Sequence, residues 1–441
     1  FFFSNVNSEN FLDYMTAQRT VSMLISILTS IPVYFLCRKF FDYKFALIGV
    51  ALFILEPRVI QNSLTGITEP LFILCTTTSL ALFFSNNKKM IYLAFAVAAL
   101  ATLVRYEGVI LFFAISILYF IKFRRDYKKI LEYGVLLGIF ILVLTPMILS
   151  TMEIRGEEKI TASIISGGET FTKEAISSNN STYHTISYII NGLTQTSKLL
   201  GWSLVPTFIL FVPIGIILMF KNKIEEKNLI LIPIIVLIIP AFYAYSRGIE
   251  ELRYFLVLYP LFCAISLFAI KQFFNKIKRR NLFLVLLIIG IIFSSVIFLE
   301  LKKIDNIHEQ EAYEISKKVV ELASATNSYF PESKYTRVAE MHNQSLIELS
   351  NRSLYEFSSG TNPQHYNTLT ELITKNELSH LVVDGASNRP TFLNDIFYHE
   401  DSFPFLIKVY DSKDDGYNYH VKIFRIDYEK FIPKNEIIMI P

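Results

Sequence analysis

Residues 88–129 read KKMIYLAFAVAALATLVRYEGVILFFAISILYFIKFRRDYKK, and the topology of the chain follows from this segment. Lys and Arg collect at both of its ends, and its apolar interior is broken only by Arg105-Tyr106-Glu107-Gly108. One continuous helix over residues 90–121 would be about 48 Å long and would carry its ends to opposite sides of a bilayer. Because cytoplasmic loops collect Lys and Arg, both ends are assigned to the cytoplasm. The stretch is therefore predicted to be a helical hairpin with Arg105 and Glu107 at its outer tip.

Further clusters of Lys and Arg extend this rule to the first 301 residues. Every segment that joins two clusters must cross the membrane an even number of times, which makes the short run 45–55 a span of its own. About ten spans are expected, counting both arms of the hairpin. The clusters outside the hairpin are Arg38/Lys39/Lys44, Lys221/Lys223/Lys227 and Lys271/Lys276/Lys278/Arg279/Arg280. The spans outside the hairpin are 20–37, 45–55, 69–85, 130–149, 203–220, 229–245, 254–270 and 282–300.

The composition agrees with a multi-pass membrane protein. Hydrophobic residues make up 52% of the 441 positions and charged residues 18%, which is too apolar for one soluble fold. The net charge of +3 comes from the inner loops, so no nucleic-acid partner is expected. Cys37, Cys75 and Cys263 lie in apolar runs, and no disulfide framework or zinc pattern exists. No cofactor is predicted; a divalent metal ion stays open, although no motif indicates one.

Residues 1–301 are predicted to form the membrane domain. The chain begins Phe-Phe-Phe-Ser, and residues 1–18 have the polarity of a loop rather than of a signal peptide. Because residues 20–37 run toward a cytoplasmic cluster, residue 1 is expected outside, and a further transmembrane helix is expected ahead of it. Residues 150–200 are also polar, and they are predicted to be an outer loop.

Residues 302–441 have ordinary polarity and no long apolar run, so they are predicted to form a small α/β domain on the extracytoplasmic side. Strands are expected at 380–384 and, as a pair joined by a turn at Asp411–Gly416, at 405–410 and 419–426. Helices are expected at 308–325 and 367–376. The run His399-Glu400-Asp401 is interpreted as polar side chains that face solvent rather than as a metal site, because consecutive residues converge poorly on one ion.

Other polar features of the predicted outer side leave alternatives open. The four Asn-x-Ser/Thr triplets would be glycosylated on an exported face, or they arise by chance in Asn-rich loops. The aromatic residues of the second domain are expected to pack in its core rather than to stack on carbohydrate. The triplets begin at Asn179, Asn180, Asn343 and Asn351.

The outer ends of the predicted helices carry Arg together with, or close to, a carboxylate. Any one such residue is explained as an anchor at the membrane boundary, and only the whole set indicates a functional site. A site that transfers a group from a membrane-embedded lipid phosphate needs these residue types, because the guanidinium fork binds phosphate and a carboxylate accepts a proton. The boundary position argues against a transporter, whose substrate site lies near the bilayer midplane. The set is Glu56, Arg58, Glu69, Arg105, Glu107, Arg247, Glu250, Glu251, Arg253 and Tyr254.

Three motifs on these outer turns carry a family resemblance. They are NSLTGITEPL at residues 62–71, ATLVRYEG at residues 101–108, and Arg253-Tyr254 with Pro260. In this order, over about residues 15–270, the chain resembles the GT-C superfamily of membrane glycosyltransferases. Within it the chain is most similar to the branch that uses polyprenyl-phosphate sugars, which includes protein O-mannosyltransferases and the lipid A aminoarabinose transferase.

The resemblance implies transfer of a sugar from a polyprenyl-phosphate donor to a protein, lipid or glycan acceptor on the outer face of the cell membrane. Catalytic roles are expected for Glu69, Arg105 and Glu107, with the two carboxylates positioning the sugar or the arginines. Binding of the donor phosphate is expected from Arg58, Arg247, Arg253 and Tyr254.

One departure from the family pattern concerns the catalytic acid. The family carries it on the first outer loop, and this sequence holds only the tail of that loop, with Glu9 and Asp13 as its acids. Neither is assigned as the base, which is expected in the part of the loop ahead of Phe1. Oligosaccharyltransferases of the same superfamily carry a Trp-Trp-Asp signature, whereas the single Trp202 is explained as an interfacial anchor. The alternative function is a non-catalytic membrane receptor or assembly factor whose outer domain binds a partner.

Overall fold

The computed structural model divides the chain into two units. The first is a helical unit, Phe11–Lys302, and the second includes Lys303–Pro441. The structure describes residues 11–85, 87–123, 127–155, 181–222, 224–249 and 251–302 of the first unit. In the second it describes residues 311, 314, 315, 318, 321, 322, 328, 329, 369, 373, 374, 378–384 and 391–431.

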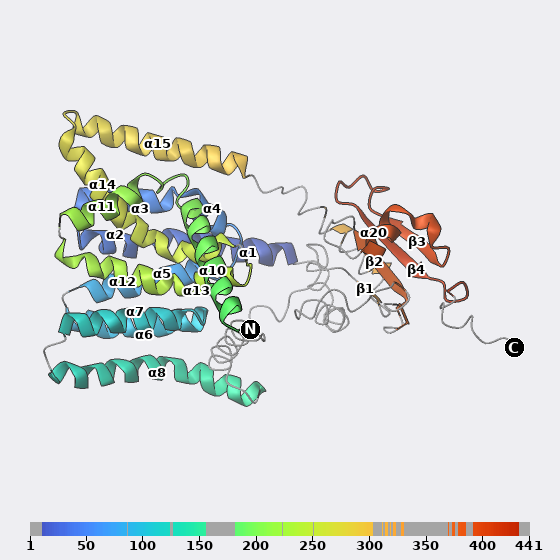
Figure 1. Ribbon diagram of the computed structural model, residues 1–441, viewed down its shortest axis with the longest axis horizontal. Coiled ribbons are helices and arrows are strands. Elements are labelled where there is room, and N and C mark those ends of the chain that lie inside the picture. Colours follow the sequence, from blue (N-terminus) through green and yellow to red (C-terminus); the bar gives the residue numbers. More distant parts are fainter. Residues whose placement is uncertain are drawn as a thin grey trace. The chain divides into compact units, whose positions relative to one another are not determined.

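The helical unit consists of helices that run back and forth (Figure 1). The first eight are α1 (Phe11–Leu28), α2 (Ser30–Arg38), α3 (Tyr43–Ile54), α4 (Pro57–Ser63), α5 (Glu69–Phe84), α6 (Lys88–Val104), α7 (Gly108–Phe123) and α8 (Tyr127–Arg155). They are followed by α10 (Ser181–Ser203), α11 (Phe211–Lys221), η1 (Glu225–Lys227), α12 (Asn228–Leu237), α13 (Ile239–Ser246), η2 (Leu252–Leu258), α14 (Tyr259–Lys276) and α15 (Arg280–Leu301).

Several of these helices have the length and composition of membrane spans. Five qualify as long spans in the described part of the chain: Thr16–Arg38, Lys128–Ser150, Asn228–Ser246, Leu252–Lys276 and Arg280–Leu301. Helices α3, α5, α7 and α11 are apolar but shorter. The apolar side chains of α15 are largely exposed, which in a helix this apolar suits contact with lipid rather than with water.

The predicted hairpin is confirmed. Helices α6 and α7 pack against each other on either side of a turn at residues 105–107, and α8 lies alongside them (Figure 1). Gly108 allows the tight turn, because a Cβ atom there would lie 2.4 Å from the backbone nitrogen of Thr102. The start of α7 can therefore approach the end of α6 only without a side chain at this position.

Two sequence predictions about the middle of the helical unit are wrong. Residues 150–200 were expected to form an outer loop, but α8 continues to Arg155 and α10 begins at Ser181; residues 156–180 lie outside the described residues. Helix α10 forms despite its polarity because it packs on α13, with Gly192 close to Phe242 and Ser246. The span expected at 203–220 begins only at Phe211, because residues 204–210 form turns around Pro206, which has no N–H group for a helical hydrogen bond.

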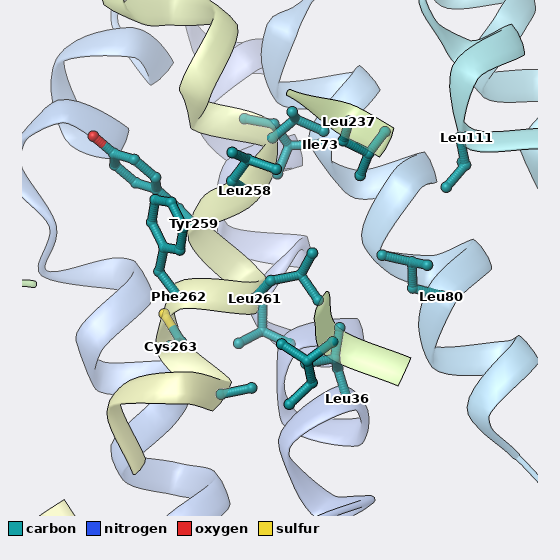
Figure 2. Packing of buried hydrophobic residues seen from close by; sticks show 14 of the residues in the cluster. Leu36, Ile73, Leu80, Leu111, Leu237, Leu258, Tyr259, Leu261, Phe262 and Cys263 are labelled. Carbon is teal, nitrogen blue, oxygen red and sulfur yellow. The ribbon is translucent and has the colours of Figure 1, made fainter. Parts of the chain in front are cut away.

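The core of the helical unit surrounds α14. The buried residues of this helix all lie between Tyr259 and Ile270, and the helix packs against α2, α3 and α11. Figure 2 shows Tyr259, Leu261, Phe262 and Cys263 of α14 among side chains of neighbouring helices. The burial of α14 fixes η2, which immediately precedes it, and so fixes one wall of the site described below.

The second unit contains a sheet with the order β1-β2-β4-β3. Strand β1 (Ser328–Tyr329) is parallel to β2 (His380–Asp384), and the other neighbours are antiparallel. Helix α20 (Thr391–Tyr398) packs on β2. The predicted strand at 380–384 is confirmed, and so is the predicted pair, as β3 (Leu406–Asp411) and β4 (Val421–Ile426).

Several predictions fall wholly or partly outside the described residues. Glu250 and the asparagines of the four glycosylation triplets lie outside them. Of the helices predicted at 308–325 and 367–376 only scattered positions are described, and these are helical. In the run His399-Glu400-Asp401, Glu400 binds Lys408 at 2.7 Å and Lys422 at 2.9 Å, which gives this carboxylate a structural role.

Candidate active site

Three segments that are far apart in the sequence bring charged side chains together at one end of the helical unit. Glu69 comes from the start of α5, Arg105 and Glu107 from the turn between α6 and α7, and Arg253 from the start of η2. Arg105 lies at the centre of this group. The sequence predicted that all four lie on the same face, and the structure places them around one pocket.

Arg105 binds two carboxylates at once. Its Nη1 donates to Oε1 of Glu69 at 2.5 Å, and its Nη2 donates to Oε1 of Glu107 at 2.8 Å. A third hydrogen bond, from Nε of Arg105 to Oε2 of Glu107, measures 3.3 Å and makes the pairing of Arg105 with Glu107 bidentate. These carboxylates raise the pKa of Arg105, although desolvation acts in the opposite direction. The guanidinium is therefore a fixed cation that ties α5 to the turn between α6 and α7.

Local sequence explains how these side chains reach the pocket. Arg105 ends α6 in an extended conformation (φ −149°, ψ 135°), so its side chain leaves the helical path, and the chain reverses before Gly108. Glu69 is in the first turn of α5, where the helix dipole favours a negative charge. The adjacent Pro70 suits this position, because the first N–H groups of a helix have no partner within it.

Arg253 forms the more open side of the pocket. Its Nη1 lies 3.6 Å from the same Glu69 oxygen that Arg105 contacts, and its Nε is paired with Glu251. The side chain of Arg253 is 41% exposed, compared with 18% for Arg105. Tyr254 also lines the pocket, and its ring centroid lies 5.6 Å from the Arg253 guanidinium carbon. Of the two arginines, Arg253 is the one that a ligand can reach.

The remaining walls of the pocket are apolar. Phe72 and Ile73 of α5, Leu237 of α12, and Leu256 and Val257 of η2 contribute to them. The side chains of Glu69 and Glu107 are nearly buried, so their bonds to Arg105 form in surroundings that screen charge weakly. The cavity has a volume of about 30 Å³, which is room for water molecules. A sugar phosphate would therefore have to displace the exposed side chains on its open side.

The structure does not bring Arg58 to this pocket. Arg58 is buried, and its Nη2 donates to the carbonyl of Trp202 at 2.8 Å, while its Nη1 donates to the carbonyl of Val205. Its guanidinium carbon also lies 4.7 Å from the ring of Phe298. All of these contacts are made by the protein itself, so Arg58 joins α4 to the end of α10 and to α15.

Glu56 lies beside Arg58, with 3.7 Å between Oε1 of Glu56 and Nη1 of Arg58. The carboxyl is completely buried, in the turn between α3 and α4. Burial raises its pKa from the ordinary value of 4.5 to about 7, against the opposing effects of Thr207 and Arg58. The pair therefore belongs to the interior of the fold.

Arg247 is likewise not among the residues that line the pocket. It follows α13, and its Nη1 lies 3.5 Å from the hydroxyl of Tyr243. The two acids of the first-loop tail cannot be located relative to the pocket. Glu9 is outside the described residues, and the side chain of Asp13, in α1, is not described. In the described part of the chain, no group of three His, Cys, Asp or Glu residues is arranged to hold a metal ion.

Sequence reasoning missed two aspects of the pocket. It included Glu251 among the charged residues at the outer helix ends but assigned it no role, although its spacing of two residues from Arg253 made the ion pair a reasonable expectation. It also did not find the apolar wall from Leu237, Leu256 and Val257, because apolar residues in apolar helices carry no signal of their own.

Comparisons with known proteins agree with this architecture. Residues 9–149 match the model of the family described as dolichyl-phosphate-mannose-protein mannosyltransferase. A search of curated proteins found no match in sequence. Among solved structures, ArnT from Cupriavidus metallidurans in the apo state is similar with a TM-score of 0.50 and 10% identity, over 92% of this chain and 83% of that chain.

The apo oligosaccharyltransferase of Archaeoglobus fulgidus is also similar, with a TM-score of 0.50 and 12% identity over 84% of this chain. This chain spans 59% of the length of that protein. At these identities the solved structures establish the fold, and the predicted class of a helical membrane domain followed by a small α/β domain is confirmed. The family match over residues 9–149 and the shared fold agree with the resemblance of the chain to the GT-C superfamily of membrane glycosyltransferases.

Proposed function

We propose that this membrane protein transfers a sugar from a polyprenyl-phosphate-linked donor to an acceptor on the extracytoplasmic face. The observation that supports the proposal is the pocket formed by Glu69, Arg105, Glu107 and Arg253, in which fixed ion pairs lie beside a more exposed guanidinium. A guanidinium fork suits a phosphate, and the end of a helix bundle is where a lipid headgroup lies. The family described as mannosyltransferases that use dolichyl-phosphate mannose supports the same class of donor.

In the proposed reaction an acceptor hydroxyl or amide attacks the anomeric carbon of the sugar. The bond between that carbon and the phosphate oxygen breaks, and the polyprenyl phosphate leaves with the electron pair. Arg253, with Tyr254 beside it, stabilises the charge that develops on the leaving phosphate. Glu69 and Glu107 serve as positioning residues rather than as bases, because their oxygens already accept hydrogen bonds from Arg105. The proton of the acceptor passes to a carboxylate outside this group.

The extracytoplasmic face is proposed from the distribution of charge. The Lys and Arg clusters lie at the ends of helices opposite to Glu69, Arg105 and Arg253, and such clusters mark the cytoplasmic side. The sugar acceptor is proposed to be a protein, a lipid or a glycan of the cell envelope. Arg58 and Arg247 are left out of the phosphate site, since Arg58 is committed to backbone carbonyls and neither residue lines the pocket.

The test is transfer of labelled sugar from a polyprenyl-phosphate sugar by the full-length protein in proteoliposomes. Arg105→Ala and Glu69→Ala are expected to lower the rate strongly. Arg105→Ala removes the shared donor of two nearly buried carboxylates, and Glu69→Ala removes the bond that ties Arg105 to α5. Arg247→Ala is the matched control, since it removes a guanidinium from the same end of the helices without touching the pocket. Unchanged transfer in both pocket variants would contradict the proposal and would favour a non-catalytic membrane receptor or assembly factor.

A further inference from the structure

Glu251 stands at the open side of the pocket, and its carboxylate is paired with Nε of Arg253. Its backbone is held in place, because the buried Tyr245 donates a hydrogen bond of 2.8 Å to the Glu251 carbonyl. The side chain itself is 51% exposed. The carboxylate can therefore move away from Arg253 into solvent without any change in the path of the backbone.

The two arginines of the pocket differ in what they can offer to an anion. Arg105 already makes three hydrogen bonds to Glu69 and Glu107. Arg253 has only Glu251 on Nε and the more distant Glu69 near Nη1, and within the described residues nothing accepts a hydrogen bond from its Nη2. An incoming phosphate would therefore bind at Arg253, where Glu251 competes for the same guanidinium.

The net charge of the pocket also indicates that Glu251 competes with an incoming anion. The described charged groups of the pocket are the carboxylates Glu69 and Glu107 and the guanidiniums Arg105 and Arg253; Glu251, paired with Arg253, adds one excess negative charge. A further anion would be opposed by this excess. When Glu251 turns outward, the remaining two carboxylates and two guanidiniums balance.

We infer that Glu251 takes the place of the phosphate on Arg253 in the empty pocket and is displaced when the phosphate of the lipid donor binds. Glu251 is then a positioning residue that weakens binding of the phosphate and helps the polyprenyl phosphate product to leave. This inference rests on the proposed function, because it takes the ligand of Arg253 to be a lipid phosphate.

The experiment measures binding of farnesyl phosphate to the full-length protein in nanodiscs, with farnesol and inorganic phosphate as parallel probes. Glu251→Gln is expected to tighten binding of farnesyl phosphate about fivefold, the size expected for removing one partly exposed competing charge. The gain is expected to shrink at high salt, because exposed charges are screened. Arg253→Ala is expected to weaken binding at least tenfold, and Glu251→Asp, which keeps the charge, is expected to bind like the unmodified protein.

Glu226→Gln is the matched control. Glu226 also forms a partly exposed ion pair, with Lys39 at 2.8 Å, but it lies in the segment between α11 and α12, away from the pocket. This variant is expected to bind farnesyl phosphate as the unmodified protein does. Thermal unfolding of each variant shows whether a change in affinity comes from loss of the fold.

The possible results separate the inference from the proposed function. Arg253→Ala weakens binding of farnesyl phosphate if the phosphate site is right. If Glu251→Gln, with the unfolding temperature of the unmodified protein, then shows unchanged or weaker binding, the inference about Glu251 is wrong and the phosphate site stands. If Arg253→Ala binds farnesyl phosphate as tightly as the unmodified protein, or if farnesol binds equally well, the phosphate site of the proposed function is wrong. Tighter binding of inorganic phosphate alone in Glu251→Gln would overturn the assignment to a lipid phosphate.

Discussion

Arg58 and Arg105 look alike in the sequence, since each lies two residues from a glutamate in a turn that follows a predicted span, but the structure gives them opposite surroundings. Arg58 is buried, and it donates to backbone carbonyls at the end of α10. Arg105 lines a pocket, and its donors are used by the carboxylates of Glu69 and Glu107. An arginine bound to main-chain carbonyls maintains the fold, whereas one bound to carboxylates beside a cavity organises a site.

The largest expected effect comes from removing Arg58. Arg58→Ala leaves the buried Glu56 without its nearest cation and removes the hydrogen bonds that Arg58 donates to the carbonyls of Trp202 and Val205. The loss of unfolding free energy is expected to be about 3 kcal/mol or more, as for one partner of a buried ion pair. Thermal unfolding in detergent measures this. An unchanged unfolding temperature, together with lost binding of farnesyl phosphate, would instead make Arg58 a ligand of the donor phosphate.

Removing Arg105 should affect transfer more than stability. Arg105→Ala is expected to lower the rate of sugar transfer about a hundredfold, corresponding to about 3 kcal/mol, because the carboxylates of Glu69 and Glu107 then repel each other in the pocket. A double-mutant cycle of Arg105→Ala with Glu69→Gln is expected to show a coupling of about 1 to 3 kcal/mol in the transfer rate. Additive effects of the two changes would mean that the observed ion pair does not support the reaction.

The turn that carries Arg105 provides a third test. Gly108→Ala places a methyl group 2.4 Å from the Thr102 nitrogen, so the end of α6 and the start of α7 must separate. We expect a loss of about 1 to 3 kcal/mol in stability, typical of an overpacked site, and a lower transfer rate because Arg105 and Glu107 shift together. Gly138→Ala in α8 is the control, since nothing lies within 4 Å of a Cβ atom there. Equal unfolding temperatures and transfer rates for the two variants would contradict the described turn.

The smallest expected effect concerns the pH dependence of stability at Glu56. Burial raises the pKa of Glu56 from 4.5 to about 7, so the folded protein holds this proton more tightly than the unfolded chain does. The contribution to stability is present below pH about 4.5 and is lost as the pH rises through about 7. Glu56→Gln cannot ionise, so its unfolding temperature is expected to fall less between pH 5 and pH 8 than that of the unmodified protein. Identical pH profiles would show that the Glu56 carboxyl does not titrate in this range.

Much of the helical unit could be predicted because the bilayer imposes simple rules on the sequence. The charge clusters at both ends of residues 88–129 require a hairpin, and the hairpin places Arg105 and Glu107 at its tip, on the same face as Glu69. The role of Arg58 could not be predicted, because its partners are main-chain carbonyls around residues 202–205. Their position depends on where α10 ends, and α10 itself was missed because its polarity resembles that of a loop.

The contrast between Arg105 and Arg58 is tested most directly with the variants Arg105→Lys and Arg58→Lys. For each variant, the rate of sugar transfer per folded molecule and the unfolding temperature are measured. Both changes keep the positive charge but remove the planar fork that binds two partners. The structure predicts that Arg105→Lys keeps the unfolding temperature and loses most of its transfer rate, while Arg58→Lys unfolds at a lower temperature and keeps its rate per folded molecule. The reverse pattern, with full activity in Arg105→Lys and an inactive but stable Arg58→Lys, would contradict the assignment of the pocket around Arg105 as the active site.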